Sequence, residues 1–270
     1  MRINRSIGSV MLVARWGIAV AAVLLTTALV GVAAAQAPED PARKILRSMA
    51  AYLAGQKAFS VEFDSSIEII TPDLQKIQFN SSGRLLVSRP DRLHAARLGG
   101  YSEVEMIYDG KTLTVHDRAG AAYAQSDFSG SIDKLMDKLR HEVGVEAPGA
   151  DLMLSGVYDV LIADVLDAKY IGHAVIDGVE CEHLAFRNED TDWQIWIEIG
   201  SPLPRKYVIT SKAVTAAPQY TLVLKSWKIN PQLGADLFAF KPPANARKVA
   251  FKELPHLDEL PAGTVHGGKK

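Results

Sequence analysis

The chain of 270 residues contains a single cysteine, Cys181, so it cannot form a disulfide within itself. Its stability must therefore come from the burial of apolar side chains, for which a hydrophobic content of 48% is ample. Lys and Arg number 30 against 31 Asp and Glu. This near balance excludes the strong positive field that attracts nucleic acid or anionic lipid headgroups.

The short motifs of several enzyme classes are also missing. No glycine-rich phosphate loop stands between a strand and a helix, and the G-x-S-x-G nucleophile motif is absent. His141-Glu142 begins like a zinc-protease helix, but Val145 occupies the position of the second histidine. We therefore expect a protein that is not an enzyme and needs no cofactor. An enzyme whose catalytic groups converge from distant positions is the alternative.

One apolar run of membrane-spanning length is present, from Trp16 to Val32. Three arginines precede or flank it, and Ala33 to Ala35 follow it. This order is typical of a secretory signal peptide, so we predict that residues 1–35 are removed before Gln36 and that the mature protein is periplasmic. A retained membrane anchor is the alternative. No second run of this length follows, so we expect no membrane span after cleavage.

A helix is predicted directly after the signal peptide. Asp40 can cap it, Pro41 suits its first position, and Gly55 ends it. The apolar residues at helical spacing between these ends are Ile45, Leu46, Met49, Tyr52 and Leu53.

Short alternating segments dominate the remainder and predict about eleven strands. Asp109-Gly110 and Asp177-Gly178 each join two of them as hairpin turns. Two helical pieces, 132–143 and 152–166, interrupt the series. Because each strand has one apolar face that must be covered, we predict an α+β fold: a curved antiparallel half-barrel sheet with helices packed on its concave face. This domain would span 36–246, and the Pro- and Gly-rich segment 247–270 would be a poorly ordered tail.

Four stretches of sequence resemble a family of uncharacterised predicted periplasmic bacterial proteins. They are YDGKTLTVHD at 108–117, GVECEHLAFR at 178–187, DWQIWIEIGSPLPRKYVIT at 192–210 and FAFKPPANA at 238–246. That family is similar in fold to the LolA and LolB outer-membrane lipoprotein carriers, and other relatives of this fold are envelope-stress regulators. The resemblance implies a half-barrel with an apolar cavity and lid helices. It brings no established catalytic residues.

We predict from these observations that the apolar side of the sheet and the helix 132–143 enclose a site for a hydrophobic ligand, such as lipid or lipoprotein acyl chains. The candidate ligand-binding residues of the cavity and lid are Phe63, Ile67, Phe79, Leu85, Leu135, Met136, Leu139, Trp193, Ile195 and Ile197. The alternative is a fully packed core. The protein would then be an interaction or stress-sensing module that binds another envelope protein.

A metal site is conceivable at the hairpin around Asp177-Gly178. A two-residue turn pairs Ala174 with Cys181 and His173 with Glu182, so alternation places His173 on the opposite face from Cys181 and His183. Two ligands on one face are too few for zinc. We therefore expect no metal, a buried thiol, and a surface pair of His173 with Glu182.

Overall fold

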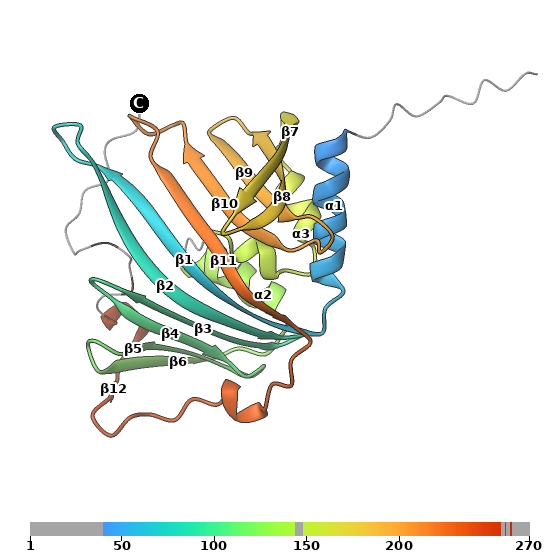
Figure 1. Ribbon diagram of the computed structural model, residues 1–270. Helices are drawn as coiled ribbons and strands as arrows, with labels where there is room; N and C mark the ends of the chain where they lie inside the picture. The colour runs from blue at the N-terminus through green and yellow to red at the C-terminus, as the bar shows by residue number, and fades with distance from the viewer. Residues whose placement is uncertain (1–39, 144–147, 255–256, 258–259, 261–270) are drawn as a thin grey trace, which may run out of the picture. The chain divides into compact units, whose positions relative to one another are not determined.

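The computed structural model describes residues 40–143, 148–254, 257 and 260 (Figure 1). The predicted signal peptide lies outside the described residues. Helix α1 (Pro41–Ala54) opens the described chain. The Asp40 carboxylate accepts the backbone N–H of Ala42 at 2.8 Å, and Gly55 is the carboxy-terminal cap. Both predicted ends of this helix are thus confirmed.

Twelve strands form one sheet. Their bounds are β1 (Ala58–Ile70), β2 (Lys76–Ser88), β3 (Arg92–Gly99), β4 (Glu103–Tyr108), β5 (Thr112–Asp117), β6 (Ala122–Asp127), β7 (Asp167–Ile176), β8 (Val179–Arg187), β9 (Thr191–Glu198), β10 (Pro204–Ser211), β11 (Gln219–Ile229) and β12 (Arg247–Lys248). Their order across the sheet is β12-β6-β5-β4-β3-β2-β1-β11-β10-β9-β8-β7. All neighbours are antiparallel except β12, which runs parallel to β6. The predicted fold class is confirmed, with β12 as the strand beyond the eleven expected.

The hairpin between β7 and β8 shows how local sequence sets the register. Asp177 and Gly178 adopt φ angles of 49° and 79°, which is the left-handed pair that a two-residue type I′ turn requires. Ala174 therefore pairs with Cys181, and His173 pairs with Glu182, as predicted.

Helices cover the concave side of the sheet (Figure 1). They are α2 (Ile132–Lys138), which continues into a π-helical turn (Leu139–Val143), a 3₁₀ turn η2 (Ala150–Met153) and α3 (Val157–Ile162). One apolar cluster joins α1 and α3 to β8–β11, and a second joins α2 to β1–β5. The structure thus confirms that both interrupting segments are helical, the second one only in part.

The segment after β11 corrects part of the predicted tail. The 3₁₀ turn η3 (Ala235–Phe238) lies on the convex side, where Phe238 is only 1% exposed. The chain then reaches the sheet edge, where the N–H of Arg247 donates to the carbonyl of Ala121 at 2.9 Å and β12 pairs with β6. A final 3₁₀ turn, η4 (Phe251–Glu253), precedes the buried Leu254. Residues 247–254 are therefore part of the fold, because their apolar side chains cover the last strands.

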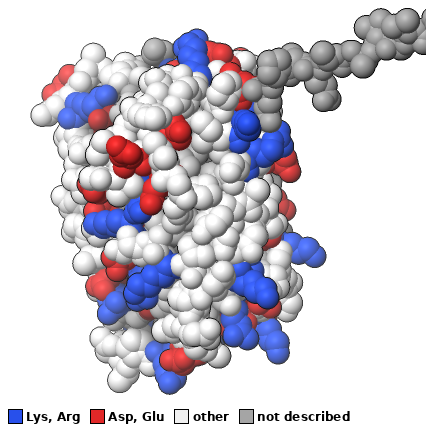
Figure 2. Space-filling view, turned by 45° about the vertical axis from the view of Figure 1, so that its right-hand side comes forward, with Lys and Arg blue, Asp and Glu red and all other residues white. Residues whose placement is uncertain are grey.

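The surface carries both signs of charge. On the face shown in Figure 2, basic and acidic side chains are interspersed rather than gathered into a patch of one sign. Within the described ranges, no helix combines the length and the apolar character needed to cross a bilayer.

Candidate functional site

The ten residues predicted to bind ligand all belong to the concave side, but they differ in burial. Six are at most 4% exposed and lie inside the two apolar clusters. These six are Leu135, Met136, Leu139, Trp193, Ile195 and Ile197. The apolar face of α2 is therefore as deeply buried as that of strand β9, so the mobility of a lid stays a prediction.

The other four predicted residues lie on β1 and β2 and are partly buried. Phe63 and Leu85 pack against the first cluster. Ile67 and Phe79 belong to no cluster among the described residues; they face each other across the two strands. The ring of Tyr101, which is 54% exposed, contacts Phe79 edge-on at 5.7 Å between centroids. We call Ile67, Phe79 and Tyr101 the apolar mouth.

Alternation along β1 places Phe63, Ser65 and Ile67 on the same concave face as the core residue Val61. Phe63 lies opposite Gly83, and an added Cβ there would be 2.2 Å from Phe63 Cζ. The missing side chain at Gly83 thus makes room for the aromatic ring. Phe63 forms the inner boundary of the apolar mouth, on the side of α1 and α3.

Two serines lie between this boundary and the mouth. Ser65 and Ser81 face each other across β1 and β2 and are 3% and 6% exposed. The Ser65 hydroxyl has no hydrogen-bond partner. Sequence reasoning passed over both serines, because it selected only the apolar members of the alternating face. The signal that marks them is their register position between apolar neighbours.

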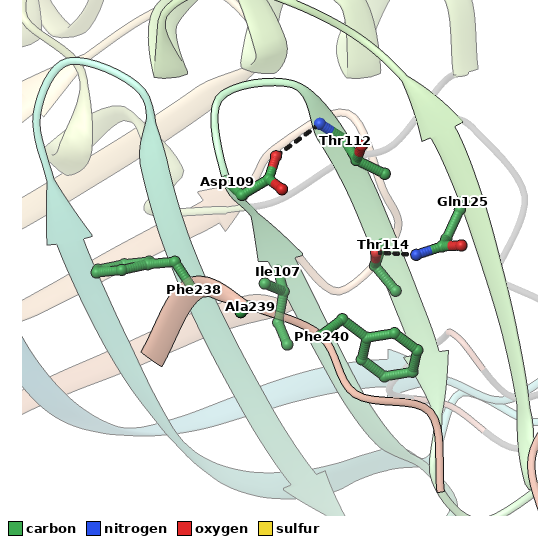
Figure 3. Close-up of a pocket in the computed structure, with 8 residues that line it drawn as sticks. All are labelled: Ile107, Asp109, Thr112, Thr114, Gln125, Phe238, Ala239 and Phe240. Atoms are coloured by element: carbon green, nitrogen blue, oxygen red, sulfur yellow. Dashed lines mark hydrogen bonds between the residues drawn. The ribbon is translucent and has the colours of Figure 1, made fainter. Parts of the chain in front are cut away.

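Two of the hollows on the described part of the surface have linings to which α1, α2 and α3 contribute no residue. One, of about 170 Å³, lies between the convex face and the segment from Phe238 to Phe240 (Figure 3). There Gln125 donates to the Thr114 hydroxyl at 3.1 Å, and Asp109 caps its own turn by accepting the N–H of Thr112 at 2.7 Å. The other, of about 220 Å³, lies where β7, β8 and β9 carry charged residues such as Asp192.

Three ionisable side chains meet on the convex side. Glu105 Oε1 lies 2.8 Å from His94 Nε2, and Glu105 Oε2 lies 3.5 Å from His116 Nδ1. The hydrogen bond from His94 lowers the pKa of Glu105 below its ordinary value, against the opposing effect of burial. His94 Nδ1 also donates to the carbonyl of Leu237 at 2.7 Å. The side chain of His94 therefore links η3 to the sheet.

The hairpin considered as a metal site has other contacts. Cys181 is fully buried, and burial raises the pKa of its thiol. His183 bonds to Gln194 at 2.9 Å and stacks on Trp196, while His173 lies 3.6 Å from Glu182. Across the part of the chain that the structure describes, no group of three or more metal-binding side chains occurs.

A family model described as "Predicted periplasmic protein (DUF2092)" matches residues 42–252. This match extends over both halves of the sheet and into η4. No curated protein matches the chain in sequence.

Several solved structures are similar in part. An uncharacterised conserved protein from Thermus thermophilus is 11% identical, with a TM-score of 0.45 over 77% of this chain and 98% of that one. LprF from Mycobacterium bovis is 13% identical, with a TM-score of 0.39 over 76% and 97%. A LolA superfamily protein from Nitrosomonas europaea is 12% identical, with a TM-score of 0.34 over 74% and 97%. At these values the solved structures assign no ligand or partner to this chain.

Proposed function

The chain belongs to the DUF2092 family of predicted periplasmic proteins, and from that premise we propose that it is a non-enzymatic binding protein for a hydrophobic ligand, such as lipid or lipoprotein acyl chains. The periplasmic location predicted from the sequence is confirmed by the family. The ligand, the absence of catalysis and the cleaved signal peptide remain proposals.

The observation that carries this proposal is the apolar mouth. Apolar side chains on the covered face of a sheet normally complete a core. Ile67 and Phe79 instead stay partly exposed and outside the clusters, and the more exposed Tyr101 continues their surface. A partly hydrated apolar surface beside a packed core gains free energy when a ligand covers it, at about 25 cal/mol per Å² of apolar area buried.

A second candidate function rests on a different surface. Strand β7 is an edge of the sheet, and its Ile171 and Val175 are 53% and 64% exposed. Leu166, just before the strand, is 71% exposed. Exposed apolar side chains along an unpaired strand edge suit the docking of another protein. This arrangement, together with the packed helices, favours the interaction module as the alternative.

Matched substitutions separate the two functions. Ile67→Ser removes apolar area from the mouth, whereas Ile171→Ser makes the same change on the β7 edge. We expect Ile67→Ser to weaken the binding of a fluorescent fatty-acyl probe by about fivefold or more, since losing part of an isoleucine contact costs about 1 kcal/mol. Ile171→Ser should leave the affinity unchanged. Circular dichroism checks that both variants are folded.

The starting material is protein purified from periplasm, examined by native mass spectrometry for bound lipid and then stripped of it. Saturable probe binding that only Ile67→Ser weakens supports the carrier. Failure of the stripped wild-type protein to bind probes of any acyl length refutes the proposed function and favours the interaction module.

A further inference from the structure

The hydroxyl of Ser65 lies buried on the concave face. The residue is 3% exposed and its Oγ has no hydrogen-bond partner. Burying a hydroxyl without a hydrogen-bond partner is unfavourable, and such groups are rare in native proteins. Alanine at this position would avoid the cost without changing the strand. The hydroxyl therefore needs an explanation that the unliganded fold does not contain.

Its neighbours indicate where a partner would come from. Along β1, Ser65 lies between Phe63 and Ile67 on the same face. On that face, the pair of Ile67 with Phe79 is the next one after Ser65 with Ser81. Residues two apart on a strand are about 7 Å apart. A ligand lying on Ile67 and Phe79 therefore has its next few atoms at the level of Ser65 along the strand.

The β3 side of the two serines has little side-chain bulk. Ser81 lies opposite Gly99 on β3, and Gly100 follows. A Cβ built on Gly100 would meet no atom within 4 Å. A Cβ built on Gly99, in contrast, would lie 2.8 Å from the Ser81 hydroxyl oxygen. The open space therefore begins at Gly100, one residue beyond the pair of Ser81 with Gly99.

We propose that the ligand is an acyl ester or amide, and that Ser65 donates its O–H to the ligand's carbonyl oxygen while the acyl chain covers the apolar mouth. The inference rests on the proposed function and narrows its ligand class from any hydrophobic molecule to one with a carbonyl at the end of its chain. Ser65 acts as a specificity residue: its hydroxyl is unpaired in the free protein and paired in the complex. A plain hydrocarbon covers the mouth but leaves the hydroxyl unpaired.

The test compares two probes on three proteins. The probes are a pyrene-labelled fatty acid methyl ester and a pyrene-labelled alkane of the same chain length. The proteins are the wild type, Ser65→Ala and the control Ser66→Ala, which changes a serine on the opposite face of the same strand. All are used as the full chain purified from periplasm and stripped of lipid.

We expect Ser65→Ala to bind the ester about three- to tenfold more weakly than the wild type, the range that one hydrogen bond supplies. Its affinity for the alkane should be unchanged or higher, and Ser66→Ala should bind both probes like the wild type. Without ligand, Ser65→Ala should melt at the same or a higher temperature, because the substitution removes an unpaired buried hydroxyl. If Ser65 had only a structural role, Ser65→Ala would instead lower the melting temperature of the unliganded protein.

Each result decides something. If Ser65→Ala changes the affinities for ester and alkane equally, or changes neither, the assignment of Ser65 is wrong while the hydrophobic site stands. If the wild type binds neither probe, the proposed function fails together with this inference. Should Ser65→Ala be poorly folded, Ser65→Cys gives a second measurement, since it keeps a side chain of similar shape but donates only weakly. It must also favour the alkane over the ester relative to the wild type.

Discussion

The substitution Gly83→Ala tests whether the concave face is built as tightly as the structure indicates. A Cβ on Gly83 would lie 2.2 Å from Cζ of Phe63 and 2.5 Å from the carbonyl oxygen of Ala96. The ring can rotate away. The carbonyl belongs to β3, which is paired with β2 on one side and β4 on the other, so it cannot move without disturbing the ladder.

The expected cost follows from these two contacts. Inserting an atom into a packed site costs about 1–3 kcal/mol, and a backbone contact places this one near the upper end. Alanine recovers about 0.5–1 kcal/mol, because it restricts the unfolded chain more than glycine does. The net loss in the free energy of unfolding is therefore about 2 kcal/mol. For a domain of this size that lowers the melting temperature by about 4–8 °C.

Urea and thermal unfolding followed by circular dichroism measure this loss. Gly156→Ala is the matched control, since a Cβ there meets nothing within 4 Å and φ is −96°. We expect it to stay within about 0.5 kcal/mol of the wild type. In a Phe63→Leu background, Gly83→Ala should cost less, because one of the two close contacts is relieved. If Gly83→Ala unfolds at the same temperature and urea concentration as the wild type, then Phe63 and β3 do not approach Gly83 as closely as the structure indicates.

Three further outcomes are expected. The pKa of Glu105 is lowered from 4.5, chiefly by His94, so its contribution to stability is present above about pH 4.5 and is lost as the pH falls through the folded-state pKa. The difference in unfolding free energy between wild type and Glu105→Gln should therefore shrink toward acid pH in urea titrations; a constant difference contradicts the ion pair. Cys181→Ala should cost about 1 kcal/mol by thermal unfolding, and a chelator should not change the melting temperature, whereas a drop of several degrees would support a zinc site. Amino-terminal sequencing of the mature protein should begin at Gln36, and a membrane-bound chain that retains Trp16 contradicts the predicted cleavage.

Features encoded by neighbouring residues were predictable from the sequence. The ends of α1 are set by Asp40 and Gly55, and the register of β7 with β8 is set by the turn Asp177-Gly178. In both cases the deciding contacts lie within a few residues of each other. The same holds for the alternation that assigned the apolar side of β1, β2 and β9.

Features that depend on distant contacts were not predictable in this way. The carboxy-terminal segment has a composition typical of loops, yet Phe238 and Leu254 are buried because the sheet supplies partners from residues more than a hundred positions earlier. Ser65 was missed for a related reason. Its importance comes from being buried without a partner, and that depends on what surrounds it in three dimensions.

The pairing of β1 with β11 has a consequence for the order of events during export. The two strands form the seam between the halves of the sheet, and Asp64 of β1 meets Lys225 of β11 from 161 positions away. When the chain crosses the inner membrane with its amino terminus leading, β1 to β6 reach the periplasm well before β11. Until β11 arrives, β1 presents an unpaired edge on which other chains can pair. The half-barrel is thus most vulnerable to aggregation while its own translocation is unfinished, and such a long-range closure is slow once it begins.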